Sequence, residues 1–481
     1  MSGIYATFRK TGKFLFACLA RSLEQISTLV MALLAARFLL PADYGVYSLG
    51  IMFIVLVQTM AYTGFFQFIL TSKEDDTALL ATCFWLTVGL VSLASAVLAA
   101  CAYPLEWVFN AHPLGNVVLL LALVQPLASV TAWSSAALLR RGEIMLNFKI
   151  LFAQNLIALV GGVLMMWLLH SIYALVAYRY LRVIPGALLF GILGRDRPAI
   201  LFDKRIARTA TIFSGGLYGS SALKFLARYA ADLLLGLLYS PAAVGLYRFG
   251  NRVATGATDI FNKPMSSFAA TQFGATARRD SDLAVPLARF SGTITLLSAM
   301  TGAVIIVFAD DVIRLFFQPS YLPALVVTYA MALRGAAGVG QLLVEPTFAA
   351  LGRTAWVMMF DLVSTIVAVA AIFVASPAGL NALAWAQAAV VLGTTFWAFY
   401  LLRTKGKIDV VPAMWRFGGA AALAAGYGAI VYLLQRELAA FSGLPAMEAL
   451  ALGLTGAAVL ALPVLALATR LRIFSFEAFY G

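Results

Sequence analysis

Long apolar runs, separated by short polar breaks, follow one another along all 481 residues of the sequence. A helix that crosses the hydrocarbon core of a bilayer needs roughly 20 apolar residues. We expect fourteen such helices, at residues 14–40, 45–70, 77–103, 114–139, 147–169, 171–193, 210–239, 241–273, 287–309, 322–351, 355–376, 378–402, 412–434 and 444–468. Hydrophobic residues make up 62% of the chain and charged residues 11%, against about 45–50% and about 25% in soluble domains. The sequence therefore predicts an all-α integral membrane protein and excludes an ordinary soluble enzyme, a disordered chain and a nucleic-acid-binding protein.

The charged residues between these runs predict the orientation of the chain. If the N-terminus is cytoplasmic, the outside segments hold Arg314 and Arg436, whereas the inside segments hold the other loop cations, such as Arg140, Arg205 and Lys405. Cytoplasmic loops of membrane proteins are enriched in Lys and Arg. We therefore expect both termini to be cytoplasmic, and we attribute the net charge of +13 to this bias and to charges inside the spans rather than to nucleic acid.

The sequence contains no motif for binding a cofactor or a metal ion. Cys18, Cys83 and Cys101 all lie in apolar runs, and His112 and His170 are far apart at span ends. No phosphate-binding GxxxxGK[ST] motif is present, so ATP is not expected to be the direct energy source. We expect no metal, no cofactor and no enzymatic activity; proton coupling, sodium coupling and the membrane potential remain open as energy sources.

A short motif occurs twice, 200 residues apart. Residues 41–47 read PADYGVY and residues 241–247 read PAAVGLY, each directly after a Leu-rich span. Six spans separate the copies, so both copies have one orientation. This spacing predicts two six-helix lobes in a parallel pseudo-two-fold repeat, as in transporters that rock two lobes around a central site. We expect an N-lobe at residues 1–208, a C-lobe at 209–408 and an appended C-terminal helix pair at 409–481.

Three stretches of the sequence are similar to a known family. LLAARFLLPADYGVYSLG with TGFFQFILTSKE, the stretch from YAADLLLG to AATQFG, and FADDVIRLFFQPSYLPAL resemble the Wzx-type bacterial polysaccharide flippases. These belong to the multidrug/oligosaccharidyl-lipid/polysaccharide exporter superfamily, and the resemblance covers most of residues 20–350.

The resemblance implies a function and its partners. It implies a flippase in the bacterial inner membrane that moves a polyprenyl-diphosphate-linked oligosaccharide to the periplasmic leaflet, for synthesis of exopolysaccharide, capsule or the O-antigen of lipopolysaccharide. The partners would be this lipid-linked oligosaccharide, membrane lipid, and the polymerase and chain-length proteins of the pathway. We expect a monomer and no nucleic acid.

Charged residues within the expected spans are the candidate functional residues, because each costs about 2.5–3.5 kcal/mol to insert at the bilayer centre. The expected spans contain ten cations and only six acids, so ion pairs among them cannot neutralise all of the positive charge. An anionic substrate such as a diphosphate would neutralise the remainder. The candidate substrate-binding cations are Arg21, Lys224, Arg228, Arg248, Arg252, Lys263 and Arg334. The candidate coupling or ion-pairing acids are Glu24, Asp232, Asp259, Glu345 and Asp361. Ion pairs that hold helices together are the structural alternative.

Two other functions fit the same membrane-embedded architecture. A glycosyltransferase, polymerase or ligase would need paired carboxylates near a span end, usually on a substantial outer loop. The outer segments hold only short turns with the acids Asp43, Glu106, Asp310, Asp311 and Glu437. A multidrug antiporter of the same superfamily would favour an acidic cavity, and the candidate cavity here is basic.

Overall fold

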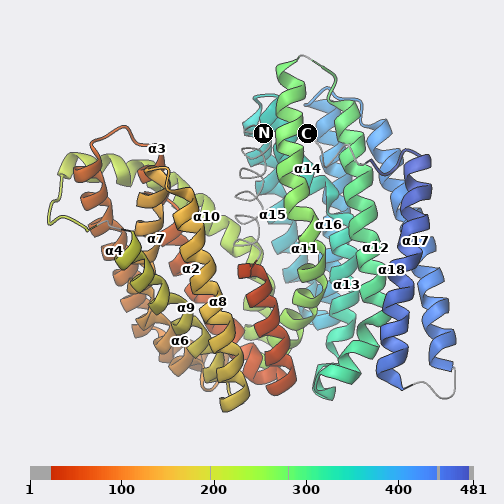
Figure 1. The fold of residues 1–481 in the computed structure, drawn as a ribbon, viewed down its shortest axis with the longest axis horizontal. Helices are drawn as coiled ribbons and strands as arrows, with labels where there is room; N and C mark the ends of the chain where they lie inside the picture. The colour runs from red at the N-terminus through yellow and green to blue at the C-terminus, as the bar shows by residue number, and fades with distance from the viewer. Residues whose placement is uncertain (1–22, 195–196, 280, 441–444, 476–481) are drawn as a thin grey trace, which may run out of the picture. The chain divides into compact units, whose positions relative to one another are not determined.

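The computed structural model describes residues 23–194, 197–279, 281–440 and 445–475. In these ranges every regular element is a helix (Figure 1). The chain divides into two compact units, of which the first ends at Gly245 and the second begins at Leu246. The prediction of an all-α membrane protein is confirmed.

The first unit contains a helix at residues 23–38, then α2 to α10 and the beginning of α11. The helices are α2 (Pro41–Tyr62), α3 (Phe65–Thr71), α4 (Asp76–Ala100), α5 (Ala102–Phe109), α6 (Leu114–Leu123), α7 (Gln125–Arg140), α8 (Ile144–Leu169), α9 (Ile172–Leu193) and α10 (Lys204–Leu238). The chain turns directly from α8 into α9 at His170, which has a left-handed backbone, and Ser171 caps α9. The chain therefore makes a tight hairpin between the expected spans 147–169 and 171–193.

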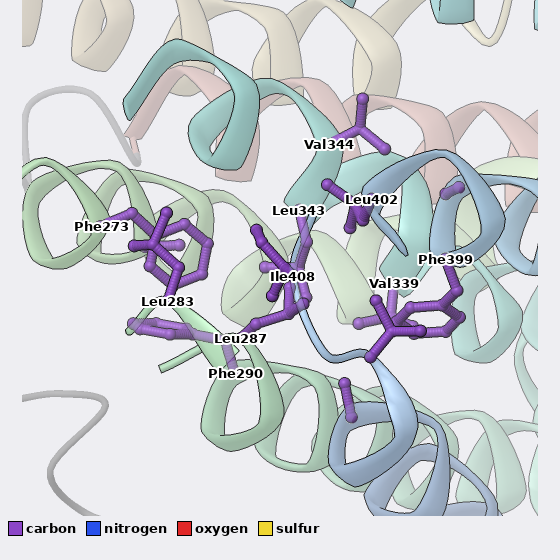
Figure 2. Packing of buried hydrophobic residues seen from close by; sticks show 14 of the residues in the cluster. Phe273, Leu283, Leu287, Phe290, Val339, Leu343, Val344, Phe399, Leu402 and Ile408 are labelled. Carbon is purple, nitrogen blue, oxygen red and sulfur yellow. The ribbon is translucent and has the colours of Figure 1, made fainter. Parts of the chain in front are cut away.

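The second unit contains the rest of α11 (Pro241–Arg278) and the helices that follow it. They are α12 (Ala284–Phe316), η1 (Pro319–Tyr321), α13 (Ala324–Ala337), α14 (Val339–Ala350), α15 (Thr354–Ala375), η2 (Ser376–Ala378), α16 (Leu380–Thr404), α17 (Val411–Ala440) and α18 (Ala446–Arg470). Its packing is dominated by buried apolar side chains. Figure 2 shows Ile408, from the segment between α16 and α17, beside Leu287 of α12 and Leu343 of α14.

Eleven helices in the described residues are long and apolar enough to cross a membrane. Each coincides with one of the expected spans. The first expected run, 14–40, begins outside the described residues. The helices α10 and α11 are long enough, but charged and small polar residues interrupt their apolar sequence. The count of fourteen thus stays a prediction, and the two long polar helices are the ones that carry most of the candidate cations.

The helix α12 extends further than the sequence suggested. We expected residues 287–309, with Asp310 and Asp311 in an outer turn, whereas the helix runs to Phe316. Asp310 accepts from Arg314 Nε at 2.9 Å, one turn later on the same helix. Asp311 accepts from Gln435 Nε2 of α17 at 2.7 Å. These side-chain contacts continue the helix through a segment whose composition resembles a turn.

An arginine at the end of α7 ties together the loops at one end of the first unit. Arg140 donates to Asp76 Oδ1 at 2.7 Å and to the carbonyl oxygens of Ile69 at 2.6 Å and Ser72 at 2.8 Å. Beside it, Glu74 accepts two bonds from Arg205, at 2.7 and 2.6 Å. The Arg205 guanidinium lowers the pKa of the Glu74 carboxyl, so this pair is ionised at neutral pH.

These loops test the predicted orientation. Reporter fusions after Arg205 and after Lys405 are expected to give a cytoplasmic signal, and fusions near His112 and near Pro319 a periplasmic one. The physical reason is the excess of Lys and Arg on the side that holds Arg205 and Lys405. A periplasmic signal after Arg205 would contradict the orientation of the first unit, and one after Lys405 that of the second.

The two copies of the repeated motif start α2 and α11. The first five residues of α11, Pro241–Gly245, belong to the first unit, where they pack against Pro41–Gly45. A Cβ on Gly45 would overlap the carbonyl oxygen of Pro241, and a Cβ on Gly245 would overlap that of Pro41. The copies therefore contact each other reciprocally, and each needs a residue without a side chain at the contact.

The last residue of each copy makes the same kind of contact within its own unit. Tyr47 OH accepts from Arg179 Nε of α9 at 3.2 Å, and Tyr247 OH donates to Gln387 Oε1 of α16 at 3.0 Å. In the expected count α9 is the sixth span and α16 the twelfth. Tyr47 near the start of α2 is thus bonded to α9, and Tyr247 near the start of α11 is bonded to α16, while the parallel repeat stays a prediction.

Candidate functional site

The helix α10 presents two of the candidate cations on one face. Lys224 and Arg228 lie one turn apart, and both are exposed. Neither forms a hydrogen bond or an ion pair with any residue in the described ranges. Asp232 lies one further turn along α10 and is completely buried. This helix therefore presents two accessible candidate cations and one buried candidate acid.

The second unit holds three more candidate cations, on α11 and α13. Arg248 and Arg252 lie one turn apart on α11, are half-buried, and take part in polar contacts. Arg334 on α13 is half-buried, and its Nη1 lies 3.5 Å from Met331 Sδ. Each of these guanidinium groups thus lies partly inside the unit rather than fully in water or lipid.

The tenth expected span is broken between α13 and α14. The break is at Gly338, and Thr395 Oγ1 donates to the Ala337 carbonyl at 2.6 Å. Gln341 and Glu345 follow on α14, so they do not lie on one continuous helix with Arg334 of α13. Gln341 Nε2 donates to Thr394 Oγ1 of α16 at 3.1 Å, and Glu345 is exposed.

In the first unit, one of the candidate acids forms an ion pair between helices. Arg182 Nη2 of α9 lies 2.5 Å from Glu24 Oε1, on the helix at residues 23–38. The Arg182 side chain is 20% exposed and that of Glu24 is 42% exposed. Close by, Tyr62 OH of α2 and Thr131 Oγ1 of α7 are 3.4 Å apart. This is the structural role that we held open for such charges.

The structure describes the remaining candidate residues only in part. Arg21 lies outside the described residues. Asp259 and Lys263 lie within α11, and their side chains are not among those described. Asp361 is exposed on α15. Gln387 is a polar partner that the sequence reasoning missed, although a glutamine inside an apolar run was a visible signal for it.

Glu106, in a segment that we expect to lie outside, takes part in local structure. Glu106 of α5 lies 2.8 Å from His112 Nδ1 and accepts from the Gly115 backbone N–H at 2.6 Å. The hydrogen bond with His112 lowers the pKa of the Glu106 carboxyl, so Glu106 is not poised to act as a general acid near neutral pH. Within the part of the chain that the structure describes, no group of three or more His, Cys, Asp or Glu side chains could hold a metal ion.

The sequence also matches a family model. Residues 34–326, more than half of the chain, match the model described as "Polysaccharide biosynthesis protein". The chain belongs to this family. No curated protein matches the sequence.

Solved transporter structures share the fold. A structure of the lipid II flippase MurJ in an inward closed conformation aligns with a TM-score of 0.77 at 13% identity, and covers 95% of this chain and 99% of that one. An inward-facing multidrug resistance transporter of the MATE family, in the MOP superfamily, aligns with a TM-score of 0.60 at 11% identity over 81% of this chain and 98% of that one. A MOP superfamily transporter from Pyrococcus furiosus aligns with a TM-score of 0.52 at 11% identity, over 81% of this chain and 94% of that one. The fold is therefore that of the exporter superfamily, which the sequence motifs indicated, and it is a fold of transporters and flippases.

Proposed function

We propose that this protein is a flippase that moves a polyprenyl-diphosphate-linked oligosaccharide from the cytoplasmic to the periplasmic leaflet of the bacterial inner membrane. Membership of the polysaccharide biosynthesis family supports a role in such a pathway. The solved structure with the same fold and nearly full coverage belongs to a protein named as a flippase of lipid II. Exopolysaccharide, capsule and the O-antigen of lipopolysaccharide are the products that such a carrier would serve.

The observation that carries the proposal is the pair of exposed cations on α10. Lys224 and Arg228 stand one turn apart within the 35-residue helix α10, with no partner in the described residues. Placing such charges in a membrane protein is costly unless water or a counter-ion meets them. A guanidinium binds phosphate oxygens through two parallel hydrogen bonds, so a diphosphate headgroup is a fitting guest.

The other candidate cations extend this site in our proposal. Arg248, Arg252 and Arg334 contribute from the second unit, together with Arg21 and Lys263. The N-lobe, residues 1–208, and the C-lobe, residues 209–408, rock around the headgroup, while the helix pair at 409–481 is appended. Glu24, Asp232, Asp259, Glu345 and Asp361 are the acids that pair with these cations or couple transport to a proton, to sodium or to the membrane potential.

Substitution of the α10 and α11 arginines tests the proposal. Arg228→Ala and Arg252→Ala are each expected to abolish export while the protein stays inserted and abundant. Loss of one charge-assisted phosphate contact costs about 1.5–3 kcal/mol, or about ten- to a hundredfold in affinity. Arg→Lys should restore only part of the export, because an ammonium lacks the bidentate geometry.

The readout is the lipid-linked oligosaccharide that accumulates on the cytoplasmic leaflet, normalised to the amount of protein in the membrane. Lys149→Ala, which removes an exposed cation near the start of α8, is the matched control and should leave export unchanged. Normal export by an abundant Arg228→Ala/Arg252→Ala double variant would refute the cationic site. A multidrug antiporter shares the fold, but its cationic substrates would be repelled by these side chains.

A further inference from the structure

Three arginines from three separate segments gather at one end of the second unit. Arg289 lies in the second turn of α12, Arg416 in the second turn of α17, and Arg472 directly after α18. Arg289 and Arg472 are both close enough to Arg416 to repel its charge. We call these three residues the arginine group.

Close backbone packing around Gly292 of α12 brings these segments together. A Cβ on Gly292 would lie 3.1 Å from Arg416 Cβ and would overlap the carbonyl oxygen of Ile473. Ser291 Oγ donates to the Ala413 carbonyl at 3.0 Å, and the Ser475 backbone N–H donates to Thr293 Oγ1 at 3.2 Å. The arginine group is thus held in place by α12, which contacts both of the other segments.

The charge of this group calls for an anion. Arg416 is half-buried and Arg472 is exposed. Within residues 281–440 and 445–475, neither of them forms an ion pair with a carboxylate. The positive charges of Arg416 and Arg472, held near each other by packing, repel one another, and a phosphate that contacts both would offset this repulsion.

An apolar groove begins beside the arginine group and follows α17. Met414, Trp415, Gly418, Gly419 and Ala422 line a hollow of about 430 Å³. The hollow runs from Met414 to Ala422, a separation of about 12 Å at about 1.5 Å per residue. Gly418 has no atom near its missing side chain, and a Cβ on Gly419 would meet Ile473 at 2.9 Å, so glycines leave the hollow open and Ile473 borders it.

The position of this groove in the chain predicts that it faces lipid. The helices α17 and α18 lie side by side (Figure 1), and α17 is largely unburied along its apolar stretch. Trp415 is 78% exposed, and tryptophans gather at the level of lipid headgroups. The orientation expected from the loop charges places this end of α17 on the cytoplasmic side.

We propose that the arginine group and this groove form a binding site for an anionic phospholipid of the cytoplasmic leaflet. The phosphate contacts Arg416 with Arg289 and Arg472, Trp415 lies at headgroup level, and one acyl chain lies along Gly418 and Gly419. Basic pockets between membrane helices on the cytoplasmic side bind anionic headgroups in this way. The charge selects the lipid, because an acyl chain gains little by leaving one apolar surface for another within the bilayer.

Native mass spectrometry of the full-length protein in detergent tests this site. Wild-type protein is expected to retain phosphatidylglycerol in preference to phosphatidylethanolamine with the same acyl chains. Arg416→Gln and Arg472→Gln should each weaken phosphatidylglycerol binding about fivefold, which corresponds to about 1 kcal/mol per surface cation. Gly418→Leu should also weaken it by filling the groove, and the open space around Gly418 lets the leucine fit without a clash.

The controls separate lipid binding from folding and from substrate binding. Arg436→Gln removes an exposed arginine near the other end of α17 and should change nothing. Thermal unfolding without added lipid should be the same for all variants. Equal retention of the two phospholipids, or unchanged binding by Arg416→Gln and Gly418→Leu, would overturn the proposal. So would displacement of phosphatidylglycerol by undecaprenyl phosphate at lower concentration, which would assign the groove to the transported lipid. Export is not the readout, so the result is independent of the proposed flippase activity.

Discussion

Replacement of Arg182 by Ala is expected to reduce the free energy of unfolding by about 1.5–3 kcal/mol, the range measured for hydrogen bonds to charged groups. The Arg182 side chain lies 2.5 Å from Glu24 and is only 20% exposed. Its removal leaves the Glu24 carboxylate without its ionic partner at membrane depth, where an uncompensated charge is costly. We expect a corresponding loss of folded protein from the membrane.

A double-mutant cycle measures whether the pair itself is responsible. Glu24→Gln and Arg182→Gln should each destabilise the detergent-solubilised protein, and the double variant should be more stable than the sum of the two losses predicts. Lys149→Gln, at an exposed position on α8, serves as the control for loss of one positive charge. Strictly additive losses would show that Glu24 and Arg182 act separately. Full stability of each single variant with loss of export would instead assign Glu24 to coupling.

Gly45→Ala and Gly245→Ala are each expected to destabilise the protein by about 1–3 kcal/mol or more, the usual cost of overpacking. The added methyl group would overlap a backbone carbonyl oxygen, of Pro241 in the first variant and of Pro41 in the second. A backbone atom cannot rotate away as the end of a side chain can, so one helix start has to move. The amount of folded protein and its thermal unfolding temperature are the measurements.

The control for these substitutions is another glycine inside a helix. Gly89 of α4 has no atom within 4 Å of its missing Cβ, so Gly89→Ala should be neutral or slightly stabilising, because alanine is the better helix former. The double variant Gly45→Ala/Gly245→Ala should be no more stable than either single variant, because each methyl group makes its own clash. A Gly45→Ala variant as stable as Gly89→Ala would contradict the reciprocal contact.

Local sequence was sufficient for the positions of the helices. The apolar runs bounded the eleven membrane-length helices to within several residues, because span length depends on neighbouring residues. The end of α12 was missed because the contacts of Asp310 and Asp311 include Gln435, more than a hundred residues later in the chain. A helix end that depends on a distant side chain cannot be derived from its own segment.

The residue types of the candidate site were predictable from the sequence, but which charged residues pair with one another was not. The cost of charge in a membrane singled out Glu24 as well as Arg228. That Glu24 pairs with Arg182, 158 positions away, while Arg228 has no such partner in the described ranges, depends on how the helices pack. A single sequence contains no signal for that packing. The arginine group was missed for the same reason, since its members are far apart along the chain.

The reciprocal contact between the two motif copies also constrains how such a chain can diverge. Each glycine is required by the proline of the other copy, so neither half can gain a side chain there unless the backbone of the other half shifts. The contacts that disfavour a side chain at Gly45 and at Gly245 are thus made by the chain with itself, so they act whatever residues surround the two motifs.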